Sequence, residues 1–233
     1  MKIAARLLSY LFHPLLVLTY GLIVLIAVDP FSFGANSIQS TQSTLLILRI
    51  FLSTFFIPAM AILMLYFLGM VKSLRLEDKM DRTGPYIITG IFYLWLLRNF
   101  WGSALVPSLY TAFMLGVTIA LFLAFLINIF SKISIHAVGI SALLAMIIIT
   151  MLTQNYNTLV IPIAQGRYLQ ASLLYLLLAL LLIAGLLGTS RLYLQKHELS
   201  ELYGGYFVGF VSPFVALQIM LILGKLNLSL STL

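Results

Sequence analysis

His197 is the residue of this chain best placed to do chemistry, because a carboxylate follows it at helical spacing. Glu201 stands four residues after it. Residues four apart share one face of a helix, so the Glu201 carboxylate can hydrogen-bond one imidazole nitrogen and fix the tautomer. The other nitrogen is then free as a nucleophile or a base. The alternative is a helix end at a membrane boundary, whose charges are only solvated.

An arginine belongs to the same polar stretch. Arg191 precedes His197 by six residues and follows Ser190. In a continuous helix Arg191 would lie off the face that carries His197 and Glu201. It would reach the same site only from a turn before the helix, which Gly188–Ser190 could provide.

Two further polar stretches carry side chains of similar chemical use. One contains Ser134 and His136, with Lys132 just before them. The other contains Arg75 and Arg82, with Lys79 between them. Each is weak evidence alone, since a lone histidine at a membrane boundary is more often interfacial and a basic loop is usually solvated.

The composition places these stretches in a membrane protein. The chain has 233 residues, of which 62% are hydrophobic and 8% charged, and its mean hydropathy is +1.12. A soluble domain carries about 25% charged residues. We expect one integral membrane domain over 1–233. Its net charge of +7 indicates basic loops facing lipid phosphates or an anionic substrate rather than nucleic acid.

Apolar runs long enough to cross a membrane set the expected architecture. We predict an all-α, polytopic bundle of six to seven transmembrane helices, of which the third is the weakest because Arg98, Asn99 and Gly102 limit it. The expected spans are 8–28, 45–71, 85–101, 107–130, 137–153, 168–188 and 204–224. Polar loops are expected at 29–44 and 154–167.

The number of spans decides whether the polar stretches can meet. The loops 72–84, 131–136 and 189–203 follow the second, fourth and sixth spans. If all seven segments cross, these three motif loops share one membrane face with the N-terminus. Nine of the 13 Lys and Arg residues fall on this face, but removing Arg75, Arg82, Lys132 and Arg191, which a substrate could hold there, leaves five against four. Charge therefore does not decide which side the face lies on.

Together the three stretches form an ordered pattern. Arg75-x6-Arg82, Ser134-x-His136 and Ser190-Arg191-x5-His197-x3-Glu201 follow one another within 72–205. This pattern resembles the type-2 phosphatidic acid phosphatase superfamily of membrane lipid phosphatases. Its motifs read Lys-x6-Arg-Pro, Pro-Ser-Gly-His and Ser-Arg-x5-His-x3-Asp.

The chain departs from these motifs at several positions but keeps each catalytic side-chain class. Arg75 replaces the lysine, and the proline comes only at Pro85. Ile133 and Ile135 replace the proline and glycine of the second motif, and Glu201 replaces the aspartate. An arginine in place of lysine exchanges a point charge for a planar fork. Ile135 can crowd a backbone N–H that glycine would expose to phosphate.

The resemblance implies a metal-independent lipid phosphatase without a cofactor. In that family's mechanism His197 is the nucleophile that forms a phosphohistidine, Glu201 orients it and His136 is the general acid. The residues implied to bind phosphate are Arg75, Arg82, Ser134, Ser190 and Arg191, with Lys79 and Lys132 as accessory cations. The partner is a membrane lipid phosphate. The resemblance also implies a bacterial plasma membrane, with the active face on the periplasmic or extracytoplasmic side.

Three alternatives stay open at this point. Asp78-x2-Asp81 resembles half of the magnesium-diphosphate motif of a membrane prenyltransferase, which needs a second aspartate-rich cluster. His136, His197 and Glu201 could be ligands of a metal-dependent membrane hydrolase. A non-enzymatic lipid-binding or transport protein would only dock anionic headgroups.

Overall fold

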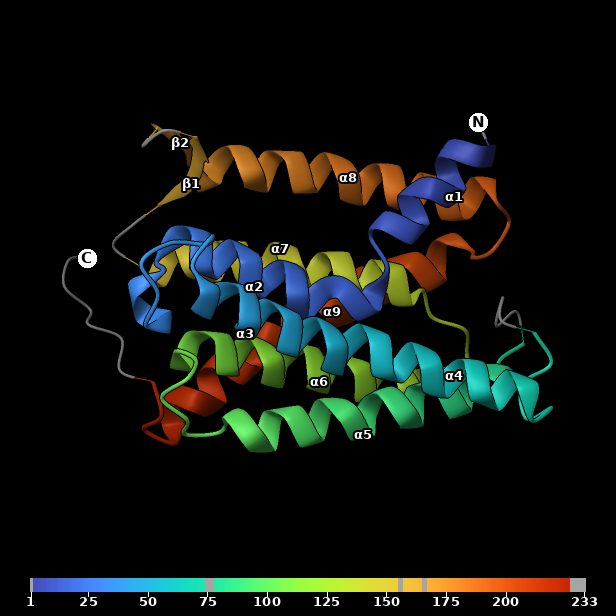
Figure 1. Cartoon of the computed structure of the whole chain (residues 1–233). Helices are drawn as coiled ribbons and strands as arrows, with labels where there is room; N and C mark the ends of the chain where they lie inside the picture. The colour runs from blue at the N-terminus through green and yellow to red at the C-terminus, as the bar shows by residue number, and fades with distance from the viewer. Residues whose placement is uncertain (1, 74–77, 155–156, 165–166, 227–233) are drawn as a thin grey trace.

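The chain forms a bundle of long helices that lie roughly side by side, with one small β-hairpin (Figure 1). The computed structural model describes residues 2–73, 78–154, 157–164 and 167–226. Within these residues six helical segments are long and apolar enough to cross a membrane. The expectation of a membrane-embedded helical bundle is confirmed.

The first apolar segment is broken near its middle. α1 (Lys2–Leu11) is followed by the 3-10 turn η1 (Pro14–Leu16) and by α2 (Val17–Val28). Pro14 has no backbone N–H, and a proline disfavours helical geometry in the residue before it. His13 accordingly adopts an extended conformation, with ψ of 134°. After this break α1 tilts away from α2 and packs on α8 (Figure 1).

The second apolar segment contains a π-turn. The 3-10 turn η2 (Phe31–Phe33) precedes it. The segment then consists of α3 (Thr41–Phe51), the π-turn η3 (Leu52–Phe56) and α4 (Ile57–Phe67). Inside the π-turn the buried Thr54 hydroxyl donates to the Ile50 carbonyl at 2.9 Å. Single π-turns inside α-helices often occur at functional sites, and this one packs against η1.

Three helices follow the second apolar segment, and the last of them is the most buried of the candidate spans. The 3-10 turn η4 (Met80–Arg82) leads into α5 (Thr83–Phe100), and α6 (Ser108–Phe130) and α7 (Ile135–Thr153) follow. α5 is not among the six candidate spans. It is nevertheless one continuous helix beside the others (Figure 1), and its 18 residues reach roughly 27 Å at 1.5 Å per residue.

A β-hairpin stands where a polar loop and the start of a helix were expected. β1 (Thr158–Ala164) pairs antiparallel with β2 (Arg167–Ser172), with Thr158 opposite Ser172. The predicted loop over 154–167 and the predicted span start at residue 168 are therefore wrong. Val160, Ile161 and Ile163 are β-branched residues, which favour strands.

The end of α8 and the start of α9 each extend about five residues beyond the predicted spans, so the turn between the two helices is shorter than expected. α8 (Leu173–Tyr193) and α9 (Leu199–Ile222) leave only residues 194–198 between them. α9 packs closely on α7, because a Cβ at Gly205 would lie 2.7 Å from the Ser134 carbonyl oxygen. Gly209 likewise faces the backbone of Val138. These small residues allow the two helices to approach.

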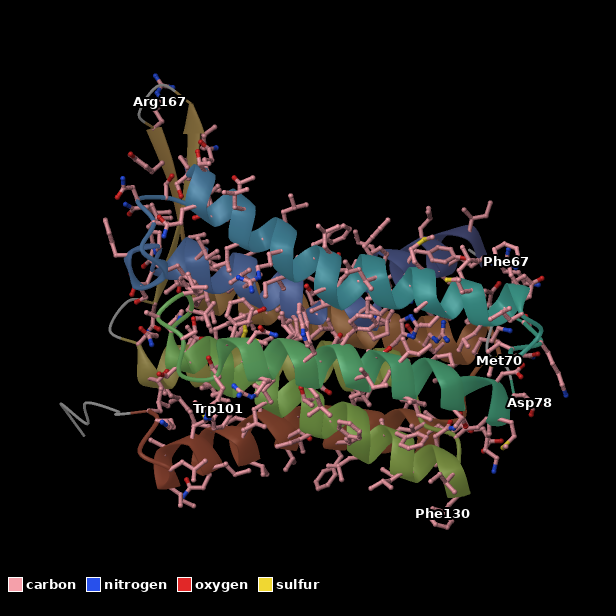
Figure 2. All side chains as sticks on the ribbon, turned by 60° about the horizontal axis from the view of Figure 1, so that its bottom comes forward. Phe67, Met70, Asp78, Trp101, Phe130 and Arg167 are labelled. Carbon is pink, nitrogen blue, oxygen red and sulfur yellow. The ribbon has the colours of Figure 1, made fainter. Side chains whose placement is uncertain are left out.

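The turns between the helices gather at two ends of the bundle. Asp78 and Phe130 lie at one end, whereas Trp101 and Arg167 lie at the other (Figure 2). We call the first the motif end, because it holds residues 78–82, 131–136 and 191–201, and the second the far end. The N-terminus also lies at the motif end (Figure 1).

Candidate functional site

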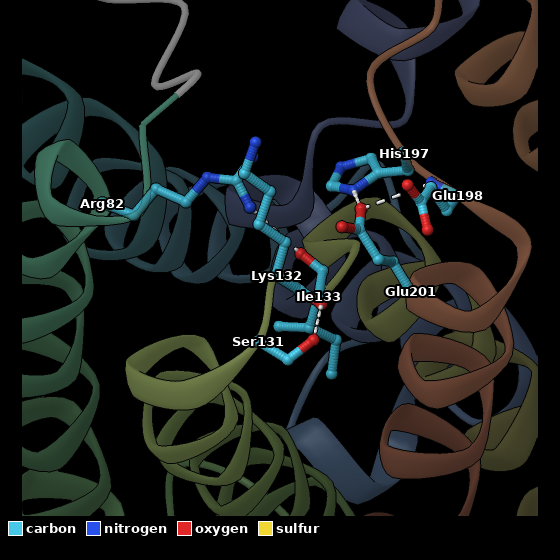
Figure 3. A network of polar contacts seen from close by, with 7 residues as sticks. All are labelled: Arg82, Ser131, Lys132, Ile133, His197, Glu198 and Glu201. Carbon is cyan, nitrogen blue, oxygen red and sulfur yellow. Dashed lines mark hydrogen bonds and ion pairs between the residues drawn. The ribbon is translucent and has the colours of Figure 1, made fainter.

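Three hydrogen bonds attach the first polar stretch to the end of α6 and to the residues that follow it. The Asn128 side-chain amide donates to the Lys79 carbonyl at 3.0 Å, and Lys79 Nζ donates to the Phe130 carbonyl at 3.1 Å. The Arg82 guanidinium donates to the Ile133 carbonyl at 3.3 Å (Figure 3). These bonds hold Arg82 against the segment that precedes Ser134.

The second stretch is attached to the third through the backbone. The Ser134 amide donates to the Glu201 carbonyl at 3.2 Å. This contact depends on the close approach of α9 at Gly205. Ile133, which replaces the proline of the family motif, is almost fully buried and anchors the segment in the core. Ile135 packs against the same core and is half-buried.

His197 contacts Glu201 as predicted, but the two residues do not lie in one continuous helix. His197 Nδ1 lies 2.6 Å from a Glu201 carboxylate oxygen. His197 stands before α9 and not inside it, since Glu198 is the N-cap and forms a capping box with Glu201. The same carboxylate oxygen accepts from the Glu198 amide at 3.4 Å. The capping box thereby fixes the carboxylate that orients the imidazole.

The turn that Gly188–Ser190 could provide before Arg191 is not formed. Gly188–Ser190 belong to α8, which continues to Tyr193. The chain turns instead after Arg191, at Leu194 and Gln195, where Gln195 has a positive φ of 53°. Arg191 and His197 thus come from opposite sides of this turn, Arg191 from the last turn of α8 and His197 from the residues before α9.

The surroundings of His197 favour its neutral form. Its side chain is almost fully buried. Burial is the main reason that the pKa of His197 is lowered from 6.5 to about 4; the charges of Arg191 and Arg82 also lower it, whereas the hydrogen bond to Glu201 raises it. With Nδ1 bonded to Glu201, His197 keeps a neutral Nε2 with a free lone pair at pH 7.

Three buried polar atoms of predicted site residues have no hydrogen-bond partner. They are Ser134 Oγ, His136 Nδ1 and Arg191 Nε, and within the described part of the chain Asn128 Oδ1 is the only other such atom. Ser134 is fully buried and is the N-cap of α7, yet its hydroxyl does not cap the helix. Buried polar groups are nearly always paired, so their concentration here indicates a place for a polar ligand.

Two residues at the end of α1 join the site, and the sequence interpretation did not include them. The Ser9 carbonyl lies 3.2 Å from His136 Nε2, and Arg191 donates to the Ser9 hydroxyl at 3.5 Å. The His13 ring lies edge-on to the His136 ring, with centroids 5.9 Å apart. The His13–Pro14 pair was the available signal, because it predicts a helix break there.

Other predicted residues are less closely involved. Arg75 lies outside the described residues. Ser190 occupies the last turn of α8. Lys132 is half-buried beside Ile133 (Figure 3).

The geometry of the acidic and imidazole groups bears on the metal-dependent alternative. Within the described residues no three His, Cys, Asp or Glu side chains are grouped so as to hold a metal ion. His136 Nε2 contacts the Ser9 carbonyl, whereas His197 Nδ1 contacts Glu201, so the two imidazoles have separate partners. The residues that this alternative needs as ligands therefore do not converge.

Comparison with known proteins adds no relative. No protein-family model, no curated protein and no solved structure matches this chain.

Proposed function

We propose that this chain is an integral membrane lipid phosphatase, which hydrolyses a phosphomonoester or diphosphate of a lipid through a phosphohistidine. The observation that carries the proposal is the set of unpartnered Ser134 Oγ and Arg191 Nε atoms, near an imidazole that Glu201 orients. Unpaired donors, a neutral nucleophile and two nearby guanidinium charges are what a phosphoryl group requires.

The phosphate would be bound mainly by arginine. Arg82 and Arg191 both lie close enough to His197 to lower its pKa. Their guanidinium groups donate charge-assisted hydrogen bonds to phosphate oxygens, and these bonds strengthen as charge develops on the oxygens. Ser134 Oγ adds a neutral donor at the first turn of α7, where the helix dipole also favours an anion.

The chemistry follows as two displacements at phosphorus. Nε2 of His197 attacks, a P–N bond forms, and the P–O bond to the lipid breaks while the protonated form of His136 gives a proton to the leaving oxygen. Water then attacks the phosphohistidine and returns a proton to His136, so that the P–N bond breaks and phosphate leaves. Glu201 holds the ring through Nδ1 and offsets its positive charge in the intermediate.

The substrate is proposed to be a lipid because the site lies within a membrane bundle. Six segments are long and apolar enough to span a bilayer, and we propose that the motif end lies at one membrane surface, where a headgroup can reach it. By resemblance, that surface is periplasmic or extracytoplasmic.

The test is release of phosphate by the detergent-purified protein in excess EDTA. The substrates are phosphatidate, phosphatidylglycerol phosphate, a polyprenyl diphosphate and a phosphorylated lipid A. We expect turnover of at least one of them, and none by the His197→Ala variant. Headgroup binding without turnover of any substrate would support the non-enzymatic alternative. Activity that needs added zinc or magnesium would support the metal-dependent one.

A further inference from the structure

The end of α1 supplies His136 with an acceptor because the helix stops there. The last carbonyls of a helix have no partner within it. At the end of α1 the Tyr20 hydroxyl satisfies the Leu11 carbonyl at 2.6 Å, and the ring of His136 satisfies the Ser9 carbonyl at 3.2 Å. In a continued helix the His13 amide would bond to the Ser9 carbonyl. The extended conformation of His13 before Pro14 leaves this carbonyl to His136.

This contact determines which nitrogen of His136 carries a proton in the neutral ring. A carbonyl oxygen only accepts, so Nε2 must donate. In the neutral ring Nδ1 is then unprotonated, and it is the buried atom of His136 that has no partner. The arrangement matches that of His197, where Glu201 holds Nδ1 and leaves Nε2 free.

His13 and the π-turn of the second segment support the same ring. The His13 ring lies edge-on to His136, at an interplanar angle of 79°, and Phe55 of η3 lies edge-on behind His13 at 5.9 Å. His13 Nδ1 accepts from the Leu15 amide at 3.3 Å, which fixes the His13 ring at the start of η1. The π-turn and the helix break thus meet behind His136.

We propose that Ser9 and His13 are positioning residues of the site, which hold His136 with Nε2–H on the Ser9 carbonyl and leave Nδ1 as the nitrogen that exchanges protons. The acid role of His136 rests on the proposed function, whereas the orientation of its ring does not. α1 thus fixes the ring of His136 as Glu201 fixes the ring of His197.

The test is the tautomer of His136, read from its imidazole ¹⁵N resonances. The chain has three histidines, so protein labelled with ¹⁵N-histidine gives three ring systems, which the variants His13→Gln and His136→Asn assign. At pH 7.5 in detergent, two-bond ¹H–¹⁵N correlation spectra should show His136 protonated at Nε2 and unprotonated at Nδ1. His136 protonated at Nδ1, or averaged between the two tautomers, would overturn the proposal.

A backbone variant tests the part played by α1. Pro14→Ala restores an N–H and allows α1 to continue through His13, so it should change the His136 ring resonances. Pro162→Ala, in β1 at the far end, should not change them. Unchanged His136 resonances in Pro14→Ala would show that the end of α1 does not position the His136 ring. If Pro14→Ala does not fold, the wild-type tautomer still decides.

Kinetics adds a second readout once a substrate is identified. A general acid contributes roughly 10²–10⁴-fold to rate, and a misplaced one keeps part of this. We expect His13→Gln to lower kcat about tenfold with little change in KM, and unaltered kcat would contradict its positioning role. The tautomer spectra need no substrate, so they decide the orientation of His136 even if no lipid phosphate is hydrolysed.

Discussion

His197 combines the two features that a nucleophilic imidazole needs at neutral pH. Burial and the charges of Arg191 and Arg82 keep the ring unprotonated, and Glu201 holds Nδ1 at 2.6 Å so that Nε2 is free. The opposing effect of Glu201 on the pKa is smaller than that of burial. The carboxylate therefore orients the ring without converting it to the cation.

The first prediction at this scale separates the nucleophile from its orienting group. His197→Ala should abolish phosphate release, because no atom remains to form the P–N bond. Glu201→Gln should keep a small fraction of the activity, since the nucleophile remains. Glu198→Gln is the matched control, because glutamine keeps an oxygen that can cap α9. Full turnover by His197→Ala would contradict the assignment.

The second prediction concerns pH. Because the pKa of His197 is lowered from 6.5 to about 4, the acid limb of kcat/KM should lie near pH 4. Arg82→Gln removes a charge that lowers this pKa and should move the limb to higher pH. A wild-type limb at pH 6.5 would contradict the burial effect. His197 binds its proton less readily in the folded protein than in the unfolded chain. Its effect on the free energy of unfolding is therefore absent above pH 6.5, and the free energy of unfolding falls as the pH is lowered from 6.5 towards 4.

The third prediction concerns the geometry of the phosphate contacts. Arg191→Lys keeps the charge but loses the forked donors. Loss of one preorganised donor costs about two to three orders of magnitude in rate, so we expect a loss of this size in kcat. Arg167→Lys at the far end (Figure 2) is the control and should keep its activity. Vanadate, which mimics five-coordinate phosphorus, should inhibit the wild type in excess EDTA.

At the scale of elements, the junction of α7 and α9 offers a test with adjacent control positions. A Cβ at Gly205 would lie 2.7 Å from the Ser134 carbonyl oxygen, whereas one at Gly204 meets nothing within 4 Å. Overpacking costs about 1–3 kcal/mol. Gly205→Ala should therefore lower the free energy of unfolding, measured by SDS titration, and should reduce activity by moving Ser134. Equal stability of Gly205→Ala and Gly204→Ala would contradict this close packing.

The helices could be predicted from the sequence more readily than their interruptions. Long apolar runs give α6 and α7 to within two residues of the expected spans, since burial in lipid requires length and apolarity alone. The hairpin was missed because β1 is a continuous apolar run without alternation, and its Pro162 argues against a strand. The π-turn at Leu52–Phe56 depends on tertiary contacts such as Thr19 with Thr54 at 3.4 Å, which the local sequence does not encode.

The site could be predicted where its partners are close in sequence. His197 and Glu201 are four residues apart, and their contact was expected from spacing. Their local structure was not, because the capping box takes Glu201 into α9 and leaves His197 before it. Ser9 lies 127 residues from its partner His136. A backbone carbonyl leaves no trace in residue type, so no spacing rule reveals this contact.

At the scale of the whole molecule, one shared site requires that the three motif turns lie at the same end of the bundle. The Arg82–Ile133 and Ser134–Glu201 bonds join three segments that are far apart in the chain. The long segments α1–α2, α3–α4 and α5 to α9 connect alternately at the motif end and the far end (Figures 1 and 2). If α5 crosses the membrane with the six more apolar segments, all three motif turns lie on one side.

The last prediction follows from this count and uses the absence of cysteine from the chain. Single cysteines at Lys79, Lys132 and Lys196 should all react with an impermeant thiol reagent from one side of the membrane, and a cysteine at Asn157 should react only from the other. If α5 did not cross, Lys79 would label from the side opposite Lys132, and Arg82 could not reach Ile133. The proposed phosphate site would then lose one of its two described arginines, so opposite labelling of Lys79 and Lys132 would exclude a shared site.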